Sequence, residues 1–210
     1  MQIILFIPVL FFSIVLHEFA HGFVAYKLGD MTAYSRGRLT LNPLKHIDIM
    51  GTLLVPLFCY MMHFPMFGWA KPVPVNPMQL PSPRKDMGKV AVAGPAVNLA
   101  LAIICVLLLK CLLLAQGFIE PALAKQLAML LQYGMLVNVL LMVFNLLPIV
   151  PLDGGRIVTA LLPPKAAWMY DTVLSRFGMW IVILLVLTGA VRYLIFPSVY
   201  FIVNLLTKIL

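Results

Sequence analysis

An apolar stretch near the start of the chain contains three ionisable side chains, His17, Glu18 and His21. Histidines at positions i and i+4 lie on one face of a helix, so two imidazole nitrogens can bind one metal ion, most commonly zinc. A glutamate beside the first histidine is placed to take a proton from a water that zinc activates. The spacing therefore predicts metal-assisted hydrolysis, with two histidine ligands and Glu18 as the general base.

Chance is a poor explanation of this spacing. With four histidines and two glutamates in the chain, the pattern His-Glu-x-x-His is expected in about one such sequence in a thousand. The alternative is a pair of hydrogen-bonded core histidines beside an incidental carboxylate. Ionisable residues inside a long apolar segment are costly and mark functional sites by default, which argues against that alternative.

A catalytic zinc ion takes three protein ligands and keeps a fourth position for water. Asp153 joins Glu18 as an acidic residue that lies against an apolar segment, since it follows the sequence NLLPIVPL and precedes Gly154 and Gly155. These prolines and glycines are expected to break a helix and to let the carboxylate point inward. We therefore predict Asp153 as the third ligand. The alternative is an ordinary turn or helix-cap carboxylate, which is common before glycine.

Two asparagines inside apolar segments, Asn98 and Asn145, are further candidates for the catalytic site. Buried amides can stabilise an oxyanion or hold the backbone of a substrate. Hydrogen bonding between helices is the alternative, and the sequence leaves both interpretations open. Gly94, which opens the sequence GPAVN, is expected to permit a close approach of two helices.

The composition places these residues in a membrane protein. The 210 residues are 63% hydrophobic and only 10% charged, and the mean hydropathy is +1.04. Soluble domains carry about 25% charged residues, so the composition excludes a soluble enzyme, a nucleic-acid-binding module and a disordered chain. The net charge of +8 does not require nucleic acid as a partner, because the positive-inside rule accounts for it. Three separate cysteines without CxxC pairing predict neither a disulfide framework nor a thiolate metal site.

Hydropathy predicts an all-α polytopic membrane protein that forms a single membrane-embedded domain over residues 1–210. Four membrane spans are expected, at about residues 2–26, 90–115, 127–147 and 177–196. Residues 38–77 are expected to form a re-entrant or interfacial element, which includes a short strand at Arg38–Leu41 and an extended proline-rich segment at Lys71–Pro77. Residues 160–176 are expected to be interfacial, and Pro197 is expected to follow the last span.

The basic residues predict the orientation in the membrane. If the first span runs from outside to inside and the others alternate, 11 of the 15 Lys and Arg residues fall on the inner side, as the positive-inside rule favours. These 11 residues are Lys27, Arg36, Arg38, Lys45, Lys71, Arg84, Lys85, Lys89, Arg156, Lys165 and Arg176. The first and third spans then run in the same direction. His17, His21 and Asp153 are therefore expected at a similar depth, near the inner side.

Three motifs together resemble the site-2 protease family of intramembrane zinc metalloproteases. They are HEFAH in the first span, GPAVN in the second and NLLPIVPLDGG at the end of the third. The stretches LGDMTAYSRGRLTLNPLKHID and GWAKPVPVNP resemble the short subgroup that lacks PDZ and CBS domains. The resemblance implies one zinc ion per chain, with His17, His21 and Asp153 as ligands and Glu18 as catalytic base. It also implies that Asn145 is the active-site asparagine of the family.

The expected function is that of an intramembrane zinc metalloendopeptidase with transmembrane or membrane-associated protein substrates. Because helices hide their carbonyl groups in hydrogen bonds, an extended element is expected to pair with the unwound substrate. The three candidates are the Arg38–Leu41 strand, a re-entrant piece at Ile49–Phe67 and the Lys71–Pro77 segment. The expected location is a prokaryotic plasma membrane, with the lipid bilayer as partner and the active site nearer the cytoplasm.

Two other functions are compatible with the sequence. A zinc or small-solute transporter is one alternative, although no inverted repeat is present. A pseudoprotease that binds substrates without cutting them is another. The sequence does not decide the oligomeric state or whether His46 is functional, and His63 is expected to be interfacial.

Overall fold

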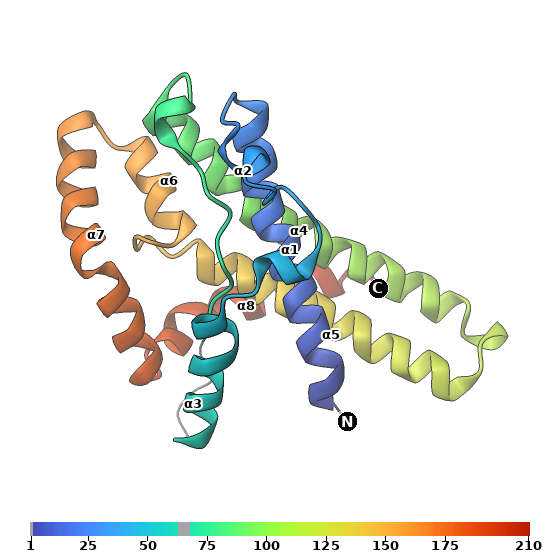
Figure 1. The fold of residues 1–210 in the computed structure, drawn as a ribbon. Helices are drawn as coiled ribbons and strands as arrows, with labels where there is room; N and C mark the ends of the chain where they lie inside the picture. Colours follow the sequence, from blue (N-terminus) through green and yellow to red (C-terminus); the bar gives the residue numbers. More distant parts are fainter. Residues whose placement is uncertain (1, 63–67) are drawn as a thin grey trace.

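The structure is a computed structural model that describes residues 2–62 and 68–210, and this part of the chain contains helices and no strand (Figure 1). The expected fold class, an all-α polytopic membrane protein, is confirmed. His63 lies outside the described residues. The α-helices are α1 (Gln2–Lys27), α2 (Thr32–Ser35), α3 (Val55–Met61), α4 (Pro83–Leu114), α5 (Pro121–Asn145), α6 (Asp153–Leu161), α7 (Pro164–Leu187) and α8 (Val191–Thr207).

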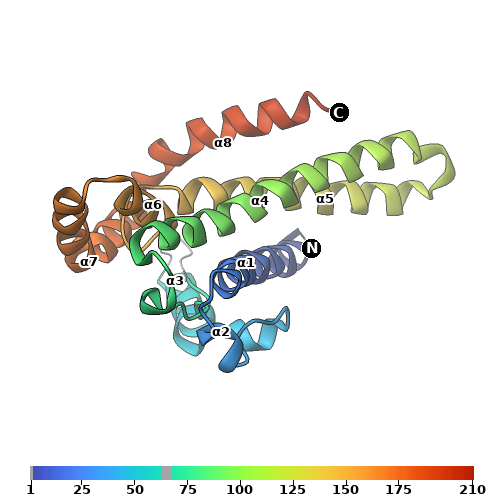
Figure 2. The same ribbon diagram turned by 90° about the horizontal axis from the view of Figure 1, so that it is seen from above.

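Three layers of helices form the main body of the protein (Figure 2). The hairpin of α4 and α5 is the middle layer, with α1 packed on one face and α8 on the other. Small and branched side chains fill the space between α4, α5 and α8, so these helices pack closely. The buried core there contains Ala102, Val106, Met135, Val139, Met142, Val143, Ile195, Val199 and Leu206.

Four helices are long and apolar enough to cross a membrane: most of α1 and the whole of α4, α5 and α7. Both α4 and α5 begin earlier than expected because Pro83 and Pro121 occupy the first helical turn, where the missing N–H of proline costs nothing. Glu120 caps α5 by accepting the backbone N–H groups of Ala122 and Leu123. These hydrogen bonds to the charged form lower the pKa of the Glu120 carboxyl.

The fourth expected span, residues 177–196, is wrong as a single helix. The chain leaves α7 and enters α8 at Gly189, which has a φ of +70°. Glycine adopts this left-handed backbone without strain, whereas other residues do not, so the helix ends here. Pro197 lies inside α8 rather than after a span. The stretch 160–176, expected to be interfacial, belongs mostly to the end of α6 and the first half of α7.

In its described residues, the 38–77 element consists of short helices and extended chain. Residues Ile49–Leu54 form a π-helix that continues directly into α3. The strand expected at Arg38–Leu41 is wrong, because the chain bends at Leu39 and Thr40 and the described part of the chain offers no neighbouring strand to pair with. Residues 70–76 are extended, and Pro72 and Pro74 prevent a helix there.

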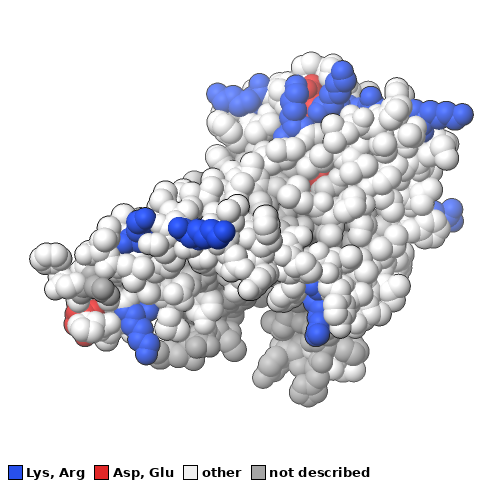
Figure 3. Space-filling view, turned by 180° about the vertical axis from the view of Figure 1, so that it is seen from behind, with Lys and Arg blue, Asp and Glu red and all other residues white. Residues whose placement is uncertain are grey.

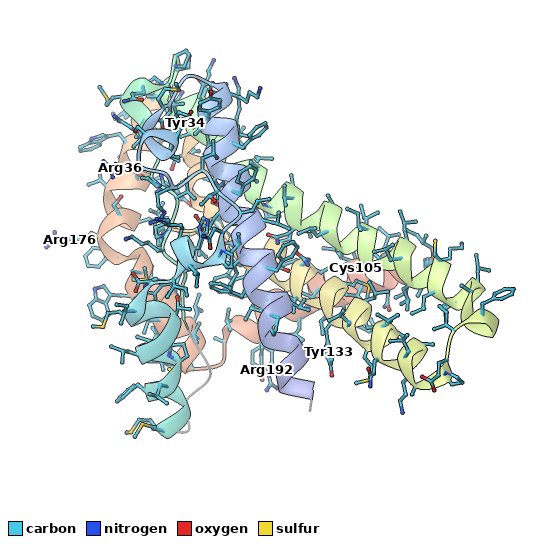
Figure 4. All side chains as sticks on the ribbon, turned by 45° about the vertical axis from the view of Figure 1, so that its right-hand side comes forward. Tyr34, Arg36, Cys105, Tyr133, Arg176 and Arg192 are labelled. Carbon is cyan, nitrogen blue, oxygen red and sulfur yellow. The ribbon has the colours of Figure 1, made fainter. Side chains whose placement is uncertain are left out.

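Lys and Arg side chains gather at one end of the molecule (Figure 3). Figure 4 places Tyr34 and Arg36 at this end and Arg192 toward the opposite end. This asymmetry is the one expected for a membrane protein whose basic loops lie on the inner side.

Asp30 connects the end of α1 to the extended segment 70–76. This carboxylate is fully buried. Its Oδ1 accepts the N–H of Thr32 at 2.9 Å, and its Oδ2 accepts the N–H of Asn76 at 2.6 Å. Hydrogen bonds to a charged acceptor are stronger than those between neutral groups. Asp30 therefore holds the segment against α1.

Replacing Asp30 with alanine is expected to lower the stability of the protein by about 1.5–3 kcal/mol, because two backbone N–H groups lose a charged acceptor. Thermal unfolding in detergent would measure this loss as a lower midpoint. Asp171→Ala, at an exposed position on α7, is the matched control and should leave the midpoint unchanged. Equal midpoints for the two variants would contradict the structural role of Asp30.

Candidate active site

The two histidines of the motif lie one helical turn apart on α1, on the face that packs against α4. Both are buried, and their Nε2 atoms lie 3.0 Å apart. The rings meet edge to face, with an angle of 84° between their planes. The i and i+4 spacing thus brings both imidazole nitrogens to one point, as helix geometry requires. The opposite helix leaves room for them because residue 94 is a glycine: a Cβ there would lie 2.5 Å from both rings.

Asp153 approaches this pair from the other side of the site. It opens α6 after the non-helical turn 146–152, and its Oδ2 lies 3.1 Å from Nε2 of His17 and 3.3 Å from Nε2 of His21. The next residue, Gly154, lies so close to the Leu146 backbone that a Cβ would overlap it. The glycine therefore lets α6 begin directly against the end of α5. Together the three side chains form a group that could hold a metal ion.

Hydrogen bonds on the far side of both imidazoles determine where the protons lie. Nδ1 of His17 faces Oδ1 of Asn98, and Nδ1 of His21 lies 2.7 Å from the carbonyl oxygen of Val90. Both oxygens can only accept, so each Nδ1 carries a proton, and in its neutral form each imidazole presents the lone pair of Nε2 to Asp153. Oδ2 of Asp153 is buried and makes no hydrogen bond within the described part of the chain.

Three potential electron-pair donors, two nitrogens and one oxygen, thus converge on one point. The lone pairs of neutral imidazoles and a carboxylate in this arrangement repel one another, and a metal ion bound by all three atoms would remove that repulsion. Two histidines and one carboxylate are also a known ligand set of catalytic zinc, which keeps a fourth position open. The donor set therefore fits zinc.

A cavity of about 280 Å³ opens beside the three side chains. Glu18 lines it and is half-buried, with its Oε2 accepting the N–H of Val73 at 2.8 Å. The extended segment 70–76 thus passes directly beside the predicted base, and Val75 of the same segment also lines the cavity. The predicted ligands, the predicted base and an extended stretch of chain share one hollow.

The two predicted asparagines lie in different places. Asn145 lines the cavity, and its Nδ2 donates to the carbonyl of Leu141 in its own helix. Asn98 is fully buried and contacts His17, and it is not among the cavity-lining residues. A contact of Asn98 with substrate stays a prediction, whereas the contact that the structure shows is with a histidine.

His46 lies outside the cavity. Its ring is fully buried, and its Nε2 donates to the carbonyl of Thr40 at 2.9 Å. Its own carbonyl accepts the N–H of Lys71 at 2.9 Å. His46 therefore holds the start of the extended segment and supplies no donor to the metal group.

Four polar groups at or near the site were not predicted from the sequence. The side chain of Arg156 lines the cavity, and the backbone N–H of Val73 binds Glu18. The side chains of Asn138 and Ser13 continue the hydrogen bonds that begin at Asn98. Three of them carry a signal in their spacing. Ser13 lies four residues before the first histidine, Asn138 seven residues before Asn145, and Arg156 three residues after Asp153, so each shares a helix face with a predicted residue. The fourth has no such signal, because any residue could supply a backbone N–H.

Comparison with known proteins supports the chemistry of the site. A sequence model of peptidase family M50 matches residues 113–188. The chain is 40% identical to YwhC of Bacillus subtilis (strain 168) over 186 residues, which is 88% of this chain and 81% of that protein. It is 36% identical to Rip2 of Mycolicibacterium smegmatis over 191 residues, which is 90% of this chain and 68% of that protein. Both relatives carry the name "Putative zinc metalloprotease". No solved structure matches the chain.

The chain belongs to peptidase family M50.

Membership of family M50 confirms the resemblance to site-2 proteases that the three motifs indicated. The protein is accordingly a metalloprotease with zinc as its cofactor, and its four long apolar helices make it a multi-pass membrane protein. The matched region of the M50 model includes Asn145 and Asp153.

Gly94→Ala is expected to remove most of the zinc from this M50 protease. The new Cβ would lie 2.5 Å from Nε2 of both His17 and His21 and would displace the rings. Elemental analysis of the purified protein would measure zinc per chain. Gly117→Ala is the matched control, since no atom lies within 4 Å of a Cβ there, and it should keep its zinc. Full zinc content in Gly94→Ala would contradict the close approach of Gly94 to His17 and His21.

Proposed function

We propose that this metalloprotease is an intramembrane endopeptidase that hydrolyses peptide bonds of transmembrane or membrane-associated proteins. One observation carries the proposal. Side chains that can bind zinc and a glutamate that can serve as base meet at one cavity, on helices long enough to cross a membrane. The lipid bilayer is its environment, and the basic loops on the inner side account for its charge without nucleic acid.

His17, His21 and Asp153 are proposed as the ligands of one zinc ion per chain. The support is the convergence of their three lone pairs, with both Nδ1 protons turned away from the metal position. When bound, zinc supplies a Lewis acid that polarises the scissile carbonyl and makes water acidic enough to attack near neutral pH.

Glu18 is proposed as the general base that takes the proton of the attacking water and returns it to the leaving amine. Because the N–H of Val73 holds Oε2, the other carboxylate oxygen is the one that receives the proton. Asn145, in the cavity wall on α5, is proposed to donate a hydrogen bond to the substrate or to the developing oxyanion.

The substrate must present an extended backbone, and the structure narrows the elements that can pair with it. Of the three candidates from the sequence, Arg38–Leu41 forms bends and the described part of 49–67 is helical. The segment Lys71–Pro77 is extended over most of its length, and three of its residues line the cavity. We therefore assign strand-like pairing with the substrate to this segment.

The active site is proposed to lie toward the cytoplasmic side of a prokaryotic plasma membrane. The motif histidines occupy the half of α1 that leads to Lys27, at the basic end of the molecule (Figure 3). The relatives named above are bacterial. A polar route from that end would supply water to the zinc.

Glu18→Gln is expected to abolish cleavage of a transmembrane substrate and to leave zinc content unchanged. Glutamine keeps the size of the side chain and an oxygen for Val73, but it cannot accept the proton, and loss of general base catalysis costs about 10²–10⁴-fold in rate. Cleavage assays with reconstituted protein, together with elemental analysis, would measure both effects. Asp153→Ala, the matched variant, should lose cleavage and zinc together.

Three results would contradict the proposal in different ways. Cleavage at the wild-type rate by Glu18→Gln would remove Glu18 from the reaction. Solute flux that survives the substitution would indicate a transporter. Wild-type protein that binds zinc and cleaves none of the membrane proteins supplied to it would indicate a pseudoprotease.

Val75→Pro tests the pairing segment. Val75 lines the cavity, and no residue in the described chain accepts its N–H, so this group is available to a substrate. Proline removes the N–H, and loss of one hydrogen bond of about 1.4 kcal/mol lowers kcat/KM about tenfold. Val75→Ala keeps the N–H and should cleave at close to the wild-type rate, while both variants keep their zinc. Equal cleavage by the two variants would show that the segment does not pair with the substrate.

A further inference from the structure

Asn98 belongs to a row of buried polar side chains that runs from His17 into the middle of the helix layers. Nδ2 of Asn98 donates to Oδ1 of Asn138 at 2.8 Å. Nδ2 of Asn138 in turn donates to the carbonyl oxygen of Gly134 at 2.8 Å and to Oγ of Ser13 at 2.9 Å. The side chains of Ser13, Asn98 and Asn138 are each at most 3% exposed. The row connects α1, α4 and α5.

The carbonyl of Gly134 sets the direction of every hydrogen bond in this row. A backbone carbonyl can only accept, so Asn138 turns its amide NH₂ toward Gly134 and its oxygen toward Asn98. Asn98 then turns its NH₂ toward Asn138 and its oxygen toward His17. With an acceptor at Nδ1, a neutral imidazole carries its one N–H proton there, and the lone pair of Nε2 faces Asp153.

We propose that Asn138 is a positioning residue that holds His17, through Asn98, in the tautomer that binds the metal. A neutral imidazole can carry its proton on either nitrogen, and only a lone pair on Nε2 makes a ligand at this site. His21 does not depend on the row, because the carbonyl of Val90 contacts its Nδ1 directly. The proposal rests on the ligand assignment made under the proposed function.

Close packing of α4 on α5 keeps the row intact. A Cβ added at Gly134 would lie 2.7 Å from Sγ of Cys105 on α4. Figure 4 shows this region, with Cys105 on α4 and Tyr133, the neighbour of Gly134, on α5. The same glycine thus lets the two helices approach and provides the carbonyl that orients the amides.

A simpler role for these residues is hydrogen bonding that only holds the helices together. The two roles differ in what restores function. A packing role requires the contacts themselves, whereas a positioning role requires only that an acceptor face Nδ1 of His17. A carboxylate in place of the Asn98 amide is an acceptor whatever Asn138 does, because it has no NH₂ group.

The decisive measurement is the affinity of detergent-purified protein for zinc, obtained by competition with a chelator and without any substrate. Loss of a residue that orients a metal ligand costs about 10–100-fold in metal affinity, and we expect this loss for Asn138→Leu. The visible absorption of the cobalt(II)-substituted protein should change in parallel, since it reports on the coordinating atoms.

Adding Asn98→Asp to Asn138→Leu is expected to bring the zinc affinity back to within about threefold of wild type, because the carboxylate itself fixes the proton on Nδ1 of His17. Ser13→Ala should keep the wild-type affinity, because the carbonyl of Gly134 still orients Asn138. Asn204→Leu, an exposed asparagine on α8, is the matched control for the change of side chain.

If Asn138→Leu does not fold, Asn98→Leu and Asn98→Asp make the same comparison one residue nearer to the histidine. The leucine variant should lose affinity, and the aspartate variant should keep it. Wild-type affinity in Asn138→Leu would overturn the proposal, as would a loss that Asn98→Asp does not restore. Wild-type protein that binds no zinc would instead overturn the ligand assignment, so the two failures are distinguishable.

Discussion

Three electron-pair donors within 3.3 Å of one another need a positive charge, either a metal ion or a proton on an imidazole, to balance their repulsion. The site of this protein is built on that constraint, since Nε2 of His17, Nε2 of His21 and Oδ2 of Asp153 meet at these distances. Helix α1 supplies two of the donors, and α6 supplies the third. The packing of α1 against α4 and the start of α6 at the end of α5 both serve to bring the donors together.

The apolar surroundings make the second set of contacts as important as the donors themselves. Water is scarce inside a membrane, so each buried polar group must find a partner in the protein. The Val90 carbonyl meets that need for one histidine, and the amide row from Asn98 to Gly134 meets it for the other. The same contacts therefore satisfy these groups and orient the imidazoles, because an acceptor placed behind each ring determines which nitrogen faces Asp153.

The parts of the site that depend on local sequence could be predicted from it. Helical spacing alone brings the two histidines together, and the prolines and glycines around Asp153 indicate a break that turns its side chain inward. Composition was sufficient for the fold class. Hydropathy placed the last span wrongly, because the helix break depends on one left-handed backbone at Gly189 and averages over many residues do not detect it. The partners of Asn98 depend on how α1, α4 and α5 pack against one another. A local sequence pattern does not predict that packing.

Glu18 and the two histidines share α1 but are held by different neighbours. The amide row lies among the long helices, whereas Glu18 is held by the N–H of Val73 in the extended segment. That segment is fixed at the basic end of the molecule, where Arg38 donates to the carbonyls of Lys71 and Pro72.

In the proposed mechanism, a substrate that pairs with this segment lies directly beside Glu18. The N–H of Val73 holds Oε2 of Glu18, whereas contacts inside the helix layers orient the two imidazoles. Contacts with Asp30, His46 and Arg38 fix the segment, and contacts with α4 and α5 fix the imidazoles. Together they determine where Glu18 lies relative to the three donors.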